Sequence, residues 1–270
     1  MPRPPHLVSA ALLVLSVCGC ASHHRDVPQA GTQEQPAQAP APSSERTVTL
    51  GTSVRGEPLT MYVFGTGPDV TFVFSAIHGD EPTAAYVGRK LLEHLRRLPP
   101  PEANRTIALL PLANPDGVAA GTRTNANGVD CNRNFPAANF KTRLWGRANS
   151  GGRPGSEPET AAVMRAVDVL KPARIVSIHS GLRCNNPDGP AGAAELAAVL
   201  ARYNGYPVQA SVGYPTPGSF GSWAGNDLGI PVVTLELPRH NNCEKAWAEN
   251  RDGLLAVMGV GPAVARGAAD

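Results

Sequence analysis

The sequence carries little net charge and has no strongly basic or acidic segment. Its 24 Lys and Arg residues and 22 Asp and Glu residues give a formal charge of +2 at pH 7 over 270 residues. A nucleic-acid-binding domain needs a basic patch or stripe that neutralises phosphates. No run of this sequence concentrates Lys and Arg in that way. Nucleic acid is therefore not an expected partner.

An apolar run long enough to cross a bilayer is also missing. The N-terminus has a short basic start and about eleven mostly apolar residues, whereas a spanning helix needs about 20. This pattern is typical of a secretory signal. The segment ends in Val17-Cys18-Gly19-Cys20, which resembles a bacterial lipobox. The resemblance implies a lipoprotein signal at residues 1–19 and a lipid on Cys20, with a soluble secreted protein as the alternative.

Large apolar side chains are scarce in the segment that follows. Residues 20–45 are rich in Ala, Pro and Gln, so they cannot bury enough surface to fold and are predicted to be a disordered tether. Ala21 and Ser22 after the lipobox favour the outer membrane, with a catalytic domain at residues 46–270 facing the periplasm. A soluble periplasmic protein is the alternative location.

Cysteines are few as well. If Cys18 leaves with the signal and Cys20 takes lipid, only Cys131, Cys184 and Cys243 remain, enough for one disulfide and one free thiol. Because Cys184 follows one candidate site residue and Cys243 another, both are expected in loops around one site. Cys184–Cys243 is the favoured pair.

Alternating strand and helix patterns predict the fold of residues 46–270. Strand patterns lie at 47–53, 59–65, 69–77, 106–114, 173–180 and 231–238, and helix patterns at 82–97, 156–170, 191–203 and from about 244. This order predicts an α/β protein, a three-layer α/β/α sandwich with a mixed, largely parallel twisted sheet. A monomer is expected.

The segment 115–155 has many Asn, Gly and Arg residues and little periodicity. A structureless segment this long inside a compact domain is usually functional. The helix after it is expected to begin at Ser156, with Glu159 completing a capping box.

Polar residues follow four of the predicted strands: His78, Asn114, His179 and Glu236. In parallel α/β sheets, ligands bind beyond the carboxyl ends of the strands. His78, Glu81 and His179 together offer two imidazoles and one carboxylate, the donor set of a catalytic zinc site with one open position. The His-x-x-Glu spacing alone fits a polar turn that opens a helix equally well.

Further candidates for chemistry lie in the long segment and in the last strand. Arg123 and Arg133 can bind carboxylates or stabilise an oxyanion, although arginines of a solvated loop are the ordinary alternative. Glu236 interrupts an apolar strand, where an ionised carboxylate is costly unless it is paired or stands at the open end. A carboxylate in that position suits a general base.

Taken together, these motifs resemble the zinc carboxypeptidases of the carboxypeptidase A type. The motifs appear in the family's order, over about residues 56–245: His78-Gly-Asp-Glu81, Asn114-Pro-Asp-Gly117, Arg123, "VDCNRNFP" (129–136), "SIHS" (177–180) and "TLELP" (234–238).

The resemblance implies a role for each matching residue. It implies one Zn²⁺ per chain, bound by His78, Glu81 and His179, with Glu236 as general base and Arg123 stabilising the oxyanion. Asn132 and Arg133 would hold the terminal carboxylate of the substrate, Asp130 would orient the first zinc-binding histidine, and Tyr214 would close over bound substrate.

The sequence departs from the digestive members of that family in two places. Asp80 stands before the glutamate ligand, where those enzymes usually carry Arg. The position that sets side-chain preference, seven residues after Tyr214, is Gly221, which offers neither an Asp for basic residues nor an apolar floor.

The motifs "NANGVDCNRNFP" and "YPTPGSFGSW" are most similar to a family member that cleaves peptidoglycan peptides. This likeness implies hydrolysis of the γ-D-glutamyl–meso-diaminopimelate bond. Three alternatives stay open: a general metallocarboxypeptidase, an aspartoacylase-like deacylase of N-acyl amino acids, and a non-catalytic lipoprotein that binds peptidoglycan.

Overall fold

The computed structural model describes residues 45–143, 149–239 and 242–260. The predicted signal, Cys20 and all but the last residue of the predicted tether lie outside these ranges. None of the helices within them is both long enough and apolar enough to span a bilayer.

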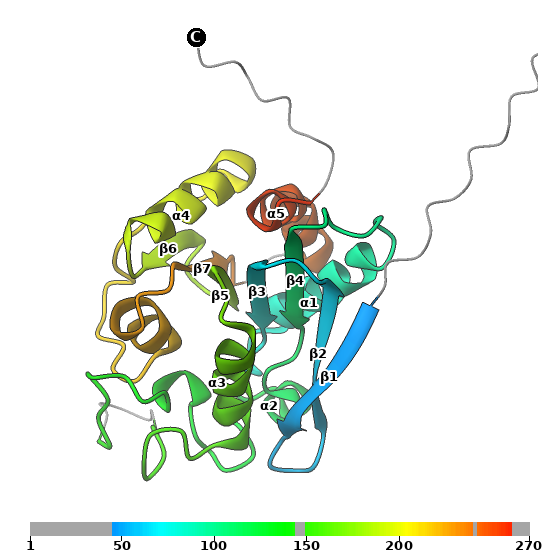
Figure 1. Ribbon diagram of the computed structural model, residues 1–270. Coiled ribbons are helices and arrows are strands. Elements are labelled where there is room, and N and C mark those ends of the chain that lie inside the picture. Colours follow the sequence, from blue (N-terminus) through cyan, green and yellow to red (C-terminus); the bar gives the residue numbers. More distant parts are fainter. Residues whose placement is uncertain (1–44, 144–148, 240–241, 261–270) are drawn as a thin grey trace, which may run out of the picture. The chain divides into compact units, whose positions relative to one another are not determined.

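A mixed seven-stranded sheet forms the centre of the domain (Figure 1), with the strand order β1-β2-β4-β3-β5-β7-β6. The four strands β4, β3, β5 and β7 are parallel, while β1, β2 and β6 run antiparallel to their neighbours. In chain order the strands are β1 (Glu45–Thr52), β2 (Pro58–Gly65), β3 (Asp69–Ser75), β4 (Arg105–Leu110), β5 (Arg174–Ser180), β6 (Cys184–Asp188) and β7 (Val232–Leu237).

Helices cover both faces of this sheet. They are α1 (Pro82–Leu95), α2 (Pro115–Ala120), α3 (Pro158–Leu170), α4 (Ala191–Asn204) and α5 (Cys243–Met258), with a 3₁₀ turn η1 (Cys131–Arg133) and a π-helix η2 (Gly221–Asp227). One buried apolar cluster joins the sheet to α1, α4 and α5, and a second joins its other face to α3, η1 and η2. The predicted three-layer α/β/α class is therefore confirmed.

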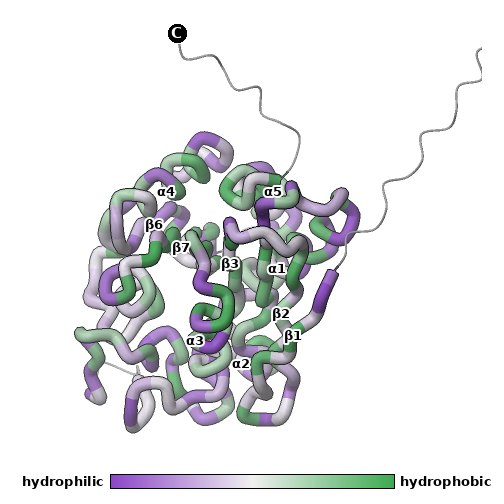
Figure 2. The backbone as a smooth tube through the Cα atoms, viewed as in Figure 1, coloured by the Kyte–Doolittle hydropathy of each residue, from purple (hydrophilic) through white to green (hydrophobic). Residues whose placement is uncertain are grey.

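The central strands form because their sequences are apolar on both faces. β3 and β4 are almost completely buried and appear as mostly hydrophobic segments in Figure 2, as expected for parallel strands covered by helices on each side. The helix α1 begins at Pro82, as predicted, because proline fits the first helical position. Its predicted inner face, which includes Val87 and Leu91, is buried.

The structure corrects three local predictions. The segment 115–155 is not structureless, because it contains α2 and η1. The capping box is absent: the N-cap of α3 is Glu157, and the Ser156 hydroxyl donates to the Glu157 side chain instead. The edge strand β6 was not predicted, since its polar sequence with Pro187 lacks a strand pattern and proline is tolerated only at sheet edges.

The predicted disulfide is also wrong. Cys184 and Cys243 are both free thiols. Cys184 lies in β6, paired across the sheet with Glu236, whereas Cys243 is the first residue of α5 and faces the Thr83 hydroxyl at 3.9 Å. The long-range order of the sheet, which spacing along the chain does not report, places the two thiols on different elements.

Candidate active site

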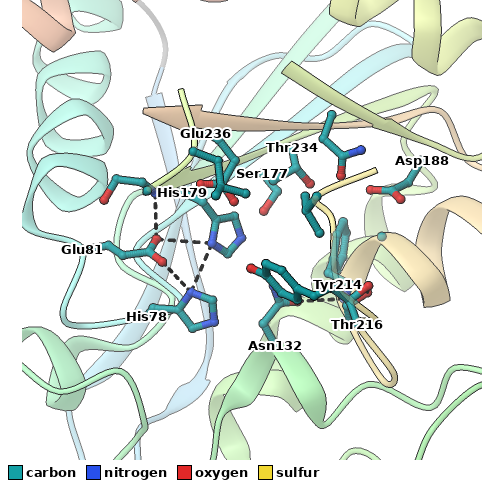
Figure 3. A pocket seen from close by; sticks show the side chains of 18 of the residues that line it. His78, Glu81, Asn132, Ser177, His179, Asp188, Tyr214, Thr216, Thr234 and Glu236 are labelled. Carbon is teal, nitrogen blue, oxygen red and sulfur yellow. Dashed lines mark hydrogen bonds and ion pairs between the residues drawn. The ribbon is translucent and has the colours of Figure 1, made fainter. Parts of the chain in front are cut away.

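Three donor groups meet at the carboxyl ends of β3 and β5. His78 Nδ1 lies 2.8 Å from Glu81 Oε1 and 3.2 Å from His179 Nδ1, and His179 Nδ1 lies 3.3 Å from Glu81 Oε2. All three residues are buried, and Figure 3 shows them facing one another.

This group fits a zinc ion. Ligand atoms about 2.0–2.1 Å from a tetrahedral ion lie about 3.3 Å apart, close to the separations between these donor atoms. Two imidazoles and one carboxylate also leave a fourth position open, as in catalytic zinc sites. His78, Glu81 and His179 are a candidate metal-binding group on their geometry alone.

The electrostatics of the group favour a cation. Burial alone lowers the pKa of His78, but the charges of Glu81 and Asp130 outweigh it and raise that pKa to about 9. Burial alone raises the pKa of Glu81, but His78 and His179 hold it well below its usual range. Glu81 therefore stays ionised, and a metal ion bound here would take the place of the proton on His78.

The first histidine is held by a buried aspartate. Asp130 Oδ1 lies 3.1 Å from His78 Nε2 and accepts the backbone N–H of Asn132, while Oδ2 accepts Arg123 Nε at 2.9 Å. A proton on His78 Nε2 shared with this carboxylate leaves Nδ1 free to bind metal, which is the usual arrangement around zinc-binding histidines. The structure thus places Asp130 where it can orient His78.

The loop that carries the first two ligands is anchored on α2. After β3 the chain turns through Ala76, a buried non-glycine residue with φ 56°, a costly conformation typical of functional sites. Asn114 holds this turn: its Nδ2 donates to Ile77 O, and its Oδ1 caps α2 by accepting Gly117 N–H. The prediction that Asn114 ends a strand is wrong, because β4 ends at Leu110 and Asn114 is the N-cap of α2. Asn114 supports the site and is not part of the ligand group.

Gly79 lies against α2 so closely that no side chain fits. A Cβ at this position would stand 1.9 Å from the carbonyl carbon of Gly117. We expect Gly79→Ala to destabilise the fold by about 1–3 kcal/mol and to weaken zinc binding about 10–100-fold, as mutations beside metal ligands do. Thermal unfolding and zinc titration measure the two effects.

Gly152→Ala is the matched control for this substitution, because nothing lies within 4 Å of its Cβ position. It should leave both quantities unchanged. Equal zinc affinity in Gly79→Ala and the native chain would show that α2 does not position the ligand loop.

The predicted substrate-binding pair lies in and beside η1. Asn132 Oδ1 accepts the backbone N–H of Phe220 at 2.8 Å, which leaves its amide N–H groups for a ligand. Arg133 is 8% exposed and donates to Asn132 O, and it forms no ion pair within the described part of the chain. Both side chains line the same cavity as the metal-binding group, so a nearly buried guanidinium without a counter-ion faces the space where substrate binds.

Arg123 and Tyr214 also line this cavity. Arg123 is shared between Asp130 and Glu81, with Nη1 3.6 Å from Glu81 Oε1. Tyr214 is 52% exposed, in the loop between α4 and η2.

Glu236 lies beside His179 in the sheet, since the two are register partners on β7 and β5. It is 9% exposed and makes no hydrogen bond or ion pair with any described residue. Burial raises its pKa, and the charge of His179 opposes this rise. A carboxylate whose pKa is raised toward neutrality can both accept and return a proton.

Sequence reasoning missed a group of polar residues deeper in this cavity: Ser177, Asn186, Asp188 and Thr234. Ser177 and Thr234 stand two residues before His179 and Glu236 on the same strands, so the two-residue period of a strand could have identified them. Asp188 carried no such signal, because β6 was not predicted. Gly221 itself offers no carboxylate, but Asp188 of β6 stands where a side chain at that position would lie, since Asp188 Oδ2 would be 2.2 Å from a Cβ there.

Fold and site together define a zinc metallopeptidase, and the chain belongs to the zinc carboxypeptidase family, whose model matches residues 35–186. It is 38% identical over 201 residues to murein peptide amidase A of Escherichia coli K12, covering 70% of this chain and 79% of that protein. The Vibrio campbellii enzyme of the same name is 33% identical over 216 residues, covering 73% of this chain and 84% of that protein.

Solved structures agree with this assignment. The crystal structure of the murein-tripeptide amidase from Escherichia coli O157 matches with a TM-score of 0.67 at 33% identity, over 83% of this chain and 94% of that one. Carboxypeptidase A from Helicoverpa armigera matches with a TM-score of 0.65 at 19% identity, over 80% and 68% of the two chains, and so shares the fold.

Proposed function

We propose that this protein is a zinc amidase, acting as a monomer, that hydrolyses the γ-D-glutamyl–meso-diaminopimelate bond of peptidoglycan peptides. The observation that carries the proposal is that the metal-binding group, Glu236 and Arg133 line one cavity. The 38% identity to murein peptide amidase A supports the choice of substrate.

Binding begins with the carboxylate at the end of the peptide. Arg133 forms a charge-assisted pair with it, and the amide of Asn132 donates a further hydrogen bond. The scissile carbonyl then lies beside His78, Glu81 and His179. Zinc, when bound there, supplies a Lewis acid that polarises this carbonyl and makes water more acidic.

The chemical step uses two further residues. Glu236 removes a proton from the attacking water and later delivers it to the leaving nitrogen of diaminopimelate, as general base and then general acid. Arg123 donates to the carbonyl oxygen as it becomes negative. Tyr214 closes over the cavity and limits access of bulk water.

A digest of purified muropeptides and of the tripeptide L-Ala-γ-D-Glu-meso-diaminopimelate tests the proposal. We expect mass spectrometry to show free diaminopimelate and the dipeptide L-Ala-D-Glu. Release of C-terminal residues only from α-linked peptides would make the protein a general metallocarboxypeptidase. Turnover of N-acyl amino acids alone would make it a deacylase, and peptidoglycan binding without any hydrolysis would make it a binding protein.

We also propose that the protein is a lipoprotein of the outer membrane, anchored through Cys20, on the strength of its lipobox-like segment. In a Gram-negative host, we expect the Cys20→Ala protein to be missing from the membrane fraction. Mass spectrometry of its N-terminal peptide should show no added lipid mass. Cys18→Ala is the matched control and should stay lipidated. Retention of lipid in Cys20→Ala, or its loss in Cys18→Ala, would contradict this assignment.

A further inference from the structure

The cavity extends along the sheet behind the catalytic residues as a second row of polar side chains. His179 pairs with Glu236, and one step back along the strands Ser177 pairs with Thr234, which pairs with Asn186. Residues two apart on a strand share a face, so the second row borders the same cavity as the first. Figure 3 shows Ser177 and Thr234 next to His179 and Glu236.

A carboxylate without a partner stands two residues beyond Asn186 on β6, where its register partner is Val232. Asp188, the last residue of β6, lines the cavity and is partly buried. It forms no hydrogen bond or ion pair with any residue that the structure describes, and burial raises its pKa to about 6. A cation that binds beside a carboxylate in such surroundings stabilises its ionised form.

The π-helix η2 holds this carboxylate in place. A Cβ on Gly221 would stand 2.2 Å from Asp188 Oδ2, and a Cβ on Gly225 would stand 2.8 Å from Asp188 Cβ. Only residues without a side chain allow η2 to lie this close. Asp188 therefore occupies the space that a side chain at position 221 would take. It is held there by β6, which carries it, and by η2, which packs against it.

The neighbours of Asp188 leave further hydrogen-bonding groups unused. Ser177 Oγ is fully buried and has no hydrogen-bond partner among the described residues, although a buried hydroxyl normally has one. Asn186 Nδ2 donates to Gln209 O, so its carbonyl oxygen remains an acceptor. This part of the cavity thus offers the Asp188 carboxylate and the Asn186 amide oxygen to a cation. Its hydroxyl groups, on Ser177 and Thr234, can bind a positive or a negative group.

None of the cavity's arginines pairs with Asp188. Arg123 is bound to Asp130, Arg133 donates to a backbone oxygen, and Arg239 lies beside Gly181. The negative charge of Asp188 is therefore not neutralised within the described chain. The guanidinium of Arg133, in the same cavity, is available to bind the terminal carboxylate of the substrate.

We propose that Asp188, Asn186 and Ser177 form a subsite that binds the ammonium group at the end of the C-terminal residue's side chain. The leaving residue is then a diamino acid, with its α-carboxylate on Arg133 and its distal ammonium on Asp188. In meso-diaminopimelate the distal carbon also bears a carboxylate, to which the Ser177 and Thr234 hydroxyls donate. This inference rests on the proposed amidase function and names the group that the enzyme recognises.

Four tripeptides with the same scissile bond, L-Ala-γ-D-Glu-X, test the subsite. X is meso-diaminopimelate, lysine (ammonium only), 2-aminopimelate (carboxylate only) or norleucine (neither). We expect kcat/KM for diaminopimelate and lysine to exceed that for aminopimelate and norleucine by about 10–100-fold, the range for hydrogen bonds to charged groups. For the Asp188→Asn variant, we expect kcat/KM to fall by about 10–100-fold on the diaminopimelate and lysine substrates and to change by less than about threefold on the norleucine substrate.

Asp168→Asn is the matched control, because it removes an exposed carboxylate of α3 that pairs with Lys171. Asp168→Asn should leave kcat/KM for all four tripeptides unchanged. Zinc content and unfolding temperature should be the same in the native protein, Asp188→Asn and Asp168→Asn. If no tripeptide is cleaved, the amidase function is wrong. Three results would contradict the subsite and leave the amidase function standing. These are equal cleavage of all four tripeptides, a preference for the aminopimelate over the lysine tripeptide, or an equal loss of kcat/KM on all four tripeptides in Asp188→Asn.

Discussion

Glu236→Gln should lower kcat by a factor on the order of 10³ or more, since a positioned general acid–base group contributes about 10²–10⁴-fold. Glutamine keeps the size of the side chain but neither accepts the proton of the attacking water nor returns one to the leaving nitrogen. Glu236 makes no hydrogen bond or ion pair with a described residue, and it is not one of the three candidate ligands. The fold and zinc binding should therefore be unchanged.

The measurements for this variant are steady-state hydrolysis of the tripeptide, zinc content and thermal unfolding. Glu195→Gln, which removes an exposed carboxylate of α4, is the control and should retain full activity. A Glu236→Gln protein with normal zinc content and more than about a tenth of the native kcat would assign the proton transfers to another group.

Removal of zinc should abolish hydrolysis and also lower the stability of the fold. Without the ion, the chain retains Arg133 and Asn132 for binding but has nothing to polarise the scissile carbonyl. An ion that binds only the native state at 100 times its Kd stabilises that state by about 2.7 kcal/mol. For a domain of about 150–250 residues this corresponds to roughly 5–10 °C in Tm.

Dialysis against a chelator, followed by addition of one equivalent of zinc, tests both effects. Activity and Tm should fall together and recover together. Magnesium is the control ion: it demands six oxygen ligands, and the two imidazoles and one carboxylate do not supply them, so it should restore neither. Full activity in protein shown to contain no metal would contradict a zinc-dependent mechanism.

Much of the domain could be predicted from sequence because its signals are local. The apolar runs of β3, β4, β5 and β7 and the Pro82 start of α1 specify the α/β alternation, and parallel strands bring their carboxyl ends to one edge. His78, His179 and Glu236 each follow or end such a strand, so the site was visible along the chain. The family motifs then pointed to the same residues.

The free thiol of Cys184 and the placement of Asp188 could not be predicted, because both residues lie on β6. This short edge strand contains two asparagines and a proline, and it exists because it pairs with β7 and is covered by η2 and α4. Its pairing places Cys184 opposite Glu236 and away from Cys243. The same pairing carries Asp188 into the cavity.

The sequence by itself determined the fold class, the candidate zinc ligands and the candidate general base, since hydrophobic periodicity and motif spacing are properties of neighbouring residues. Only the tertiary structure decided what lies behind those ligands. Gly221 of η2 looked like an empty specificity position, yet its missing side chain makes room for the carboxylate of Asp188 from β6. Such complementarity arises from packing between distant segments, which no local pattern records.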